Sequence, residues 1–510
     1  MSDNIIHTFQ QRRHLEQDLA AFAQTKTETE LAAAAQRIVH TYPADLVLNL
    51  LTKHLETPDS QTRGGLGHLA ALLPPEETLI ALRAVVANRQ NNPHARFTAA
   101  VIAERFLDVE LPAALMSDLN NTDEVAYQSL REALDESKRD RHVLLEYVTQ
   151  MQAMGEAIAF MVLGLLERIP APDRIDLLRL IAQDSRPHVA EAALTRLERL
   201  AGGEASDLVL RALHTLQFTL PTALSTQAER TLRKLRFTGK RYVAPSAQQW
   251  RALLSPAEPS GYQTVWLIKQ PEPASTVGAF FGFVFSVDKG VQHFFGSDRV
   301  EQSMLPAVQT VGSMVAVATD SGDTAVLLEA PFDYGRWLVW RALARQRAGN
   351  AEPLSGEYTL YNDLFWQFDP PQLDDQVHQF FHKPDMATGV AIDPTTLDAY
   401  TATLLAHPAM EGWQLQNRTV QQAMRFSQGP DRTLPVAEMV AFTLREMEKW
   451  PERATLLTAL ETGLRMQAGW LFYAGELEIA QYAQRLADQM GALPLAQNPL
   501  LARMLAAGIA

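Results

Sequence analysis

Cysteine is absent from the 510-residue sequence. Its absence excludes disulfide bonds, thiolate zinc sites, iron–sulfur clusters and cysteine nucleophiles, and it is compatible with a reducing cytoplasm. Long apolar runs are also missing, because the most apolar stretch, residues 276–287, has only 12 residues and is too short to cross a bilayer as a helix. Charges interrupt the N-terminal MSDNIIHTFQQRRHLEQ, so we expect no signal peptide, no membrane contact and a cytoplasmic location.

Basic residues are fewer than acidic ones. The chain has 45 Lys and Arg against 59 Asp and Glu, a formal net charge of −14. This balance argues against a general nucleic-acid binder, since such proteins offer cations to phosphates. A hydrophobic content of 47% is ordinary for a globular chain, and the length suggests about three domains.

A complete catalytic signature is missing too, and the segment 374–385, DDQVHQFFHKPD, comes nearest to one. On a helix, Asp374, His378 and His382 lie four residues apart on one face, a spacing at which two histidines bind zinc. Gln379 stands where a zinc protease has its glutamate, and an amide cannot accept the proton of the attacking water. Two interpretations remain: a non-catalytic metal site, or a short helix with histidines at the edge of its apolar face. We expect no cofactor.

The first half of the chain has a helical rhythm. Between about residues 8 and 237, apolar residues recur at helical spacing and are interrupted by short breaks rich in Pro, Asn, Asp or Gly. This pattern predicts paired helices, and the first buried positions of the second helix of each pair are spaced by 32, 33, 30, 33, 31 and 38 residues. Such a period is typical of a solenoid. The seven positions are Leu31, Arg63, Arg96, Ala126, Ala159, Ala190 and Ala228.

The turns before these helices resemble those of the HEAT-like repeats, in particular the short form of phycobilisome-lyase-type proteins. The resemblance lies in an Asp or Asn in the turn and an Arg or Ala that opens the second helix, as in 59–63, 92–96 and 184–190. It implies a curved α-α superhelix, HEAT/Armadillo-like, over residues 1–240. HEAT-like arrays bind proteins, peptides or nucleic acid on their inner face.

The second half differs in composition. Aromatic and β-branched runs at 262–268, 277–285, near Gln292 and at 311–319 predict three to four strands, and an amphipathic helix follows them. We therefore expect a small α+β domain at 245–368. Helical patterns return in a C-terminal region at 370–510, so the chain as a whole is expected to be mainly α.

A basic run, ERTLRKLRFTGKR, joins the predicted solenoid to the α+β domain. It is either an anion or nucleic-acid contact, or a solvated terminal helix whose cations suit its C-terminal dipole and have acidic neighbours in space. Its cations are Arg230, Arg233, Lys234, Arg236, Lys240 and Arg241.

These patterns favour a non-enzymatic scaffold or adaptor that binds a protein partner through the HEAT-like solenoid. One alternative is an enzyme or a small-ligand or metal sensor with a pocket in residues 245–390, where His293 and Asp298 would converge with Asp374, His378 and His382. A second alternative is a nucleic-acid-associated HEAT protein that acts through the basic run.

Overall fold

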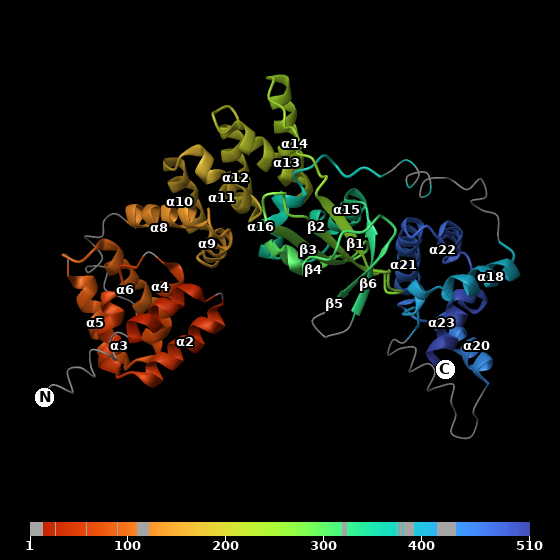
Figure 1. The fold of residues 1–510 in the computed structure, drawn as a ribbon, viewed down its shortest axis with the longest axis horizontal. Coiled ribbons are helices and arrows are strands. Elements are labelled where there is room, and N and C mark those ends of the chain that lie inside the picture. The colour runs from red at the N-terminus through yellow and green to blue at the C-terminus, as the bar shows by residue number, and fades with distance from the viewer. Residues whose placement is uncertain are drawn as a thin grey trace. The chain divides into compact units, whose positions relative to one another are not determined.

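The structure is a computed structural model in which the chain is mainly helical and carries a six-stranded antiparallel sheet (Figure 1). The chain divides into two compact units, Met1–Val143 with Phe160–Ile169, and Leu144–Ala159 with Pro170–Ala510. The described residues are 14–25, 27–57, 59–88, 90–109, 122–318, 324–373, 375, 377, 380, 392–415 and 435–509.

The first unit consists of helices in which alternate members pack together: α2 on α4, α4 on α6, and α3 on α5. Their apolar faces form one core that includes Leu50, Leu66 and Ala99. Each helix buries only one stripe, so each depends on its neighbours for stability. The helices are α2 (Glu28–Thr41), α3 (Ala44–Lys53), α4 (Ser60–Leu72), α5 (Pro75–Ala87), α6 (Pro93–Phe106) and α8 (Thr122–Glu136).

The turn residues that carry the repeat resemblance have defined structural roles. The carboxylate of Asp59 accepts a hydrogen bond from the backbone N–H of Thr62 at 2.7 Å and so caps the start of α4. The side chain of Arg63 donates to the carbonyl of Thr57 at 3.2 Å. Buried Arg96 donates in the same way to a carbonyl at the end of α5, at 2.7 Å. These arginines tie a helix to the segment before it.

Helices α9 (His142–Ala153) and α10 (Glu156–Leu165) each contain residues of both units, and α11 to α14 belong to the second. There α11 packs on α12 and α13, and α14 packs on α12 and α13. These four helices are α11 (Ala171–Ile181), α12 (Pro187–Leu200), α13 (Ser206–Thr219) and α14 (Thr222–Phe237). The seven positions predicted from the sequence each fall on a different described helix: Leu31 on α2, Arg63 on α4, Arg96 on α6, Ala126 on α8, Ala159 on α10, Ala190 on α12 and Ala228 on α14.

The sheet has the strand order β4-β3-β2-β1-β6-β5, and every neighbouring pair is antiparallel. Six strands replace the three or four expected from the sequence. The two additional strands, β1 and β6, pair with each other inside the sheet. The strands are β1 (Trp250–Leu254), β2 (Tyr262–Lys269), β3 (Val277–Ser286), β4 (Gly290–Glu301), β5 (Met314–Ala318) and β6 (Thr324–Ala330).

One face of the sheet is covered by α15 (Phe332–Arg347), in the stretch where the sequence predicts an amphipathic helix, and by α16 (Gly356–Phe365). Aromatic side chains fill the space between these helices and strands β2 to β4. Phe281 and Phe283 of the sheet each lie 5.4 Å from the ring of Phe365, centre to centre. Tyr358 and Trp366 are fully buried beside them, with the indole N–H of Trp366 donating to the Tyr358 hydroxyl.

The C-terminal part of the second unit is helical. Its longest helix, α21, packs along α22 and contributes Trp470, which donates a hydrogen bond to the carbonyl of Leu254 at the end of β1. No helix of the described part of the chain is long and apolar enough to cross a membrane. The C-terminal helices are α18 (Pro394–Leu405), α20 (Val436–Met447), α21 (Arg453–Tyr473), α22 (Leu477–Gln489) and α23 (Pro499–Ile509).

Candidate anion-binding surface on helix α14

The metal set predicted from the sequence, Asp374, His378 and His382, lies outside the described residues. Among the residues that are described, no group of three or more His, Cys, Asp or Glu side chains could hold a metal ion. His293 is exposed on β4, and Asp298 of the same strand is half-buried. These two residues therefore form no buried cluster in the described part of residues 245–390.

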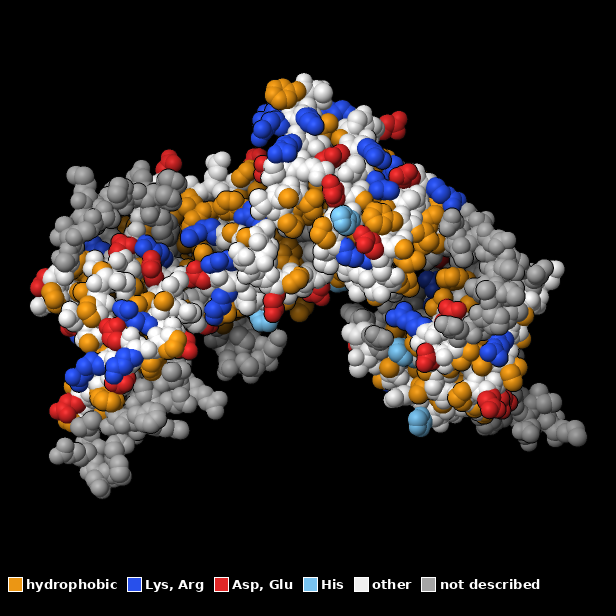
Figure 2. All heavy atoms as spheres, turned by 180° about the vertical axis from the view of Figure 1, so that it is seen from behind, with side chains coloured by type: hydrophobic (Ala, Val, Ile, Leu, Met, Phe, Trp, Pro, Cys, Tyr) orange, Lys and Arg blue, Asp and Glu red, His pale blue; other side chains and the backbone are white. Residues whose placement is uncertain are grey.

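The basic run forms the second half of α14 and the turn after it. Arg230, Arg233 and Lys234 are exposed, and their spacing of three and four residues places them on one side of the helix together with Phe237. Arg236 completes the exposed cations of the helix itself. Blue Lys and Arg side chains gather around the end of this helix at the top of Figure 2.

The exposed cations lack acidic partners. In the described structure, five side chains of the basic run make no hydrogen bond, and no carboxylate oxygen lies within 4.0 Å of their nitrogens. They are Arg230, Arg233, Lys234, Arg236 and Arg241. The acidic neighbours that the sequence analysis considered as an alternative are therefore not in ion-pair contact with them. These five cations are therefore available to an anion from outside the described chain.

Lys240 differs from the other cations of the run. Its ammonium group donates hydrogen bonds to the carbonyls of Ala201 and Gly202, both at 3.0 Å. These carbonyls follow the last turn of α12, where a positive charge is favourable. Lys240 is therefore a structural residue, and the six cations predicted as one set divide into one that anchors the chain and five that face solvent.

Two apolar residues extend the exposed surface. Phe237, the last residue of α14, is 85% exposed, and Val243 is 80% exposed. Leaving a phenylalanine in water forgoes about 2 kcal/mol of burial free energy. The sequence analysis missed both residues, although Phe237 follows Arg230 by seven positions and so lies on the same side of the helix. We call the following seven residues the α14 cationic end: Arg230, Arg233, Lys234, Arg236, Phe237, Arg241 and Val243.

The end of α14 is held in a fixed conformation. Gly239 has a φ of +83°, and its N–H donates to the carbonyl of Arg236 while the N–H of Lys240 donates to that of Leu235, at 3.1 and 3.0 Å. This is the Schellman arrangement, which requires a residue that tolerates positive φ. The chain then continues to Tyr242, whose hydroxyl donates to the carbonyl of Gln367 at 2.6 Å.

Tyr242 also stacks on buried His214 of α13, with ring centres 4.4 Å apart. His214 donates through Nε2 to the carbonyl of Phe368 at 2.7 Å and accepts from Gln217 at Nδ1. Because a carbonyl can only accept, these partners specify the neutral Nε2–H form. Burial lowers the pKa of His214 below its usual 6.5 and keeps it neutral at pH 7.

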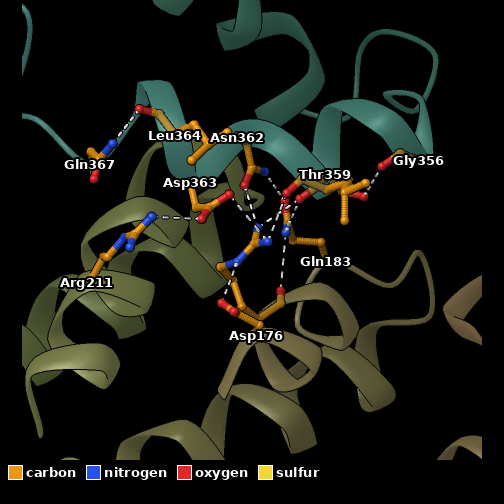
Figure 3. Close-up of polar contacts among 11 residues, drawn as sticks. Asp176, Gln183, Arg211, Gly356, Thr359, Asn362, Asp363, Leu364 and Gln367 are labelled. Atoms are coloured by element: carbon orange, nitrogen blue, oxygen red, sulfur yellow. Dashed lines mark hydrogen bonds and ion pairs between the residues drawn. The ribbon is translucent and has the colours of Figure 1, made fainter. Parts of the chain in front are cut away.

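A buried polar network fixes α11 and α13 against α16 (Figure 3). Arg179, only 1% exposed, donates to the carbonyls of Thr359 and Leu360 at 2.8 and 3.0 Å and to the side-chain oxygen of Asn362 at 2.7 Å. The carboxylate of Asp363 pairs with the guanidinium of Arg211 of α13 at 3.0 Å and lies 3.6 Å from that of Arg179. The network therefore connects the helices that carry α14 to the helix that covers the sheet.

Comparison of the chain with protein-family models, with curated proteins and with solved structures finds no match. The α14 cationic end therefore stands on its own geometry: clustered charge, exposed apolar side chains and a fixed backbone.

Proposed function

We propose that this chain is a non-enzymatic adaptor that binds an acidic segment of a partner protein at the α14 cationic end, with the helical repeats as its scaffold. The observation that carries the proposal is the group of five exposed cations that have no acidic partner in the described structure. An anionic partner would relieve their mutual repulsion and cover Phe237 in the same step. The absence of cysteine supports a cytoplasmic location as part of this proposal.

The scaffold part of the proposal rests on the repeat pattern. The seven predicted positions each fall on a different described helix, and alternate helices pack together within each unit, as α2 does with α4 and α11 with α13. Both features are expected of a HEAT-like solenoid, in which each helix pair stacks on its neighbours. In this proposal α14 is the last helix of the array.

An acidic protein segment fits this surface better than a nucleic acid does. The cations occupy a short length of helix, whereas a nucleic-acid strand needs a longer basic track along its phosphates. Exposed Glu229, Glu204 and Asp207 lie in the same region of the sequence and would repel a long polyanion. Phe237 and Val243 suit a segment in which apolar residues alternate with carboxylates. The nucleic-acid alternative keeps one observation in its favour, an exposed aromatic ring among cations.

The proposal can be tested with a fluorescein-labelled synthetic peptide of alternating Glu and Leu, followed by fluorescence anisotropy with the full-length chain. Replacing Arg233 and Lys234 together by Gln should weaken binding about twofold to thirtyfold, since each exposed ion pair contributes roughly 0.2–1 kcal/mol. Phe237→Ser should weaken binding of this peptide but not of a Glu/Ser peptide of equal charge. Arg299→Gln, which removes an exposed cation on β4, is the matched control and should leave binding unchanged.

Three outcomes separate the alternatives. If the double variant binds the peptide as the Arg299 variant does, the α14 cationic end is not the binding site. If a single-stranded oligonucleotide of equal charge binds more tightly than both peptides and loses affinity steeply with salt, the nucleic-acid alternative replaces the proposal. If the Glu/Ser peptide loses as much affinity as the Glu/Leu peptide on Phe237→Ser, the apolar part of the proposal is wrong.

A further inference from the structure

The sheet has two edge strands, β4 and β5, and they differ in chemistry. β4 carries His293, Asp298, Arg299 and Glu301, and its pairing with β3 has two register shifts. Charged side chains and bulges are the usual means by which an edge strand resists pairing with another chain. The β4 edge is protected in both ways.

Along β5 itself the edge has neither protection. Its five residues, Met314–Ala318, read MVAVA and include no charge and no proline. Five large apolar side chains on or beside this hairpin are exposed by 47% or more. An uncharged edge strand among exposed apolar side chains is a template for a further strand. The five side chains are Met304, Val308, Val311, Met314 and Val326.

The hydrogen bonds show which groups of β5 are free to pair. The backbone of Glu329 in β6 is bonded to the two residues before β5, at 2.8 and 2.9 Å. Because bonded and non-bonded pairs alternate along an antiparallel ladder, Val315 and Val317 point their backbone groups at β6. The backbone N–H and C=O groups of the other three residues point away from β6, toward the open edge, and the side chains of these residues are exposed. These residues are Met314, Ala316 and Ala318.

We propose that β5 pairs antiparallel with β5 of a second copy of this chain, centred on Ala316, and joins two sheets into one. A two-fold axis at Ala316 places Met314 of one copy opposite Ala318 of the other. Each residue whose backbone groups point to the open edge therefore meets another such residue. Three such pairs supply about six backbone hydrogen bonds. No like charges oppose each other, because the strand has none. The strand is thus complementary to itself, as a two-fold interface requires.

A single engineered cysteine tests this register directly, because the chain contains no other. In a bonded antiparallel pair the two Cα atoms are about 5.5 Å apart, which a disulfide can span. Ala316→Cys should therefore form a covalent dimer rapidly with oxidised glutathione, whereas Gln292→Cys, on the exposed β4 edge, should not. Met314→Cys alone should crosslink poorly but should crosslink well when mixed with Ala318→Cys.

Sedimentation of the unmodified chain provides the second measurement. The wild type should show a reversible dimer, and Ala316→Lys should raise its dissociation constant at least about tenfold, because two ammonium groups would face each other across the axis. A wild type that stays monomeric at about 100 μM overturns the proposal. So does an Ala316→Cys crosslinking rate no higher than that of Gln292→Cys. A dimer that Ala316→Lys leaves unchanged places the interface elsewhere.

Discussion

Replacing Arg179 by methionine should lower the free energy of unfolding of the sheet-containing unit by about 3 kcal/mol, the low end of the range for breaking a buried ion pair. Methionine keeps the apolar stem and much of the volume, so the change tests the guanidinium rather than a cavity. The buried partners left behind are two carbonyls of α16, the amide of Asn362 and the carboxylate of Asp363.

The magnitude follows from these contacts. Three hydrogen bonds from a charged donor contribute about 1.5–3 kcal/mol each. Removing Arg179 also removes the cost of burying its own charge, which offsets several kcal/mol of that sum. Asp363 keeps its contact with Arg211 at 3.0 Å, so its carboxylate is not left without a cation. The net loss should therefore lie well below the sum of the three bonds.

Tryptophan fluorescence during urea unfolding measures this effect selectively. All eight tryptophans lie at residue 250 or later, within the unit that contains the sheet. With a slope of roughly 3 kcal/mol per molar urea, the midpoint should fall by about 1 M. Arg465→Met is the control, since Arg465 is 41% exposed and pairs with Glu461 and Asp488 at the surface; it should cost less than about 1 kcal/mol. If the two variants shift the midpoint equally, the buried network contributes no more than a surface ion pair.

Four further outcomes are expected. The pKa of His214 is lowered in the folded chain, so the unfolded chain binds the proton more readily and the free energy of unfolding falls as the pH drops below about 6.5. The difference in urea midpoint between wild type and His214→Gln should therefore narrow as the pH is lowered from about 7.5 to 5.5. Gly335→Ala would place a Cβ 2.6 Å from that of Ala252 and should cost about 1–3 kcal/mol in urea unfolding. Lys240→Met should cost about 1 kcal/mol in the same assay while leaving binding of the Glu/Leu peptide unchanged. Arg230→Gln should weaken that binding yet leave the chain equally or slightly more stable, by up to about 0.5 kcal/mol, because it removes like-charge neighbours on the helix.

The helical part of the fold could be predicted because its signal is local. Ile175 and Leu178 of α11, and Val189 and Leu197 of α12, recur at helical spacing in the sequence and are all buried in the structure. Such periodicity depends only on which side of a helix faces the core. The division into units did not follow from it, since α11 to α14 belong with the sheet, and the residues that join them to it, Arg179 and Asp363, are far apart in the sequence.

Strands β1 and β6 could not be predicted for a related reason. β1 reads WRALL, is buried at all five positions and contains residues that favour helices. Its arginine is tolerated because Arg251 pairs with Glu329 of β6 at 2.5 Å, while burial raises the pKa of that glutamate. A buried charge signals a strand only after its partner is known, and that partner lies 78 residues away.

The basic run shows how one residue type acquires two roles from its surroundings. Arg230 and Lys234 are four residues apart on α14, where like charges repel by a few tenths of a kcal/mol. Around Arg465 the chain pairs an exposed cation with the carboxylates of Glu461 and Asp488. On α14 the exposed cations have no such ion-pair contact in the described structure, while Lys240, Gly239 and Tyr242 fix the backbone that presents them. Unpaired charge on a well-anchored helix end suits a binding surface for an anion, since little ordering free energy is then lost when the partner docks.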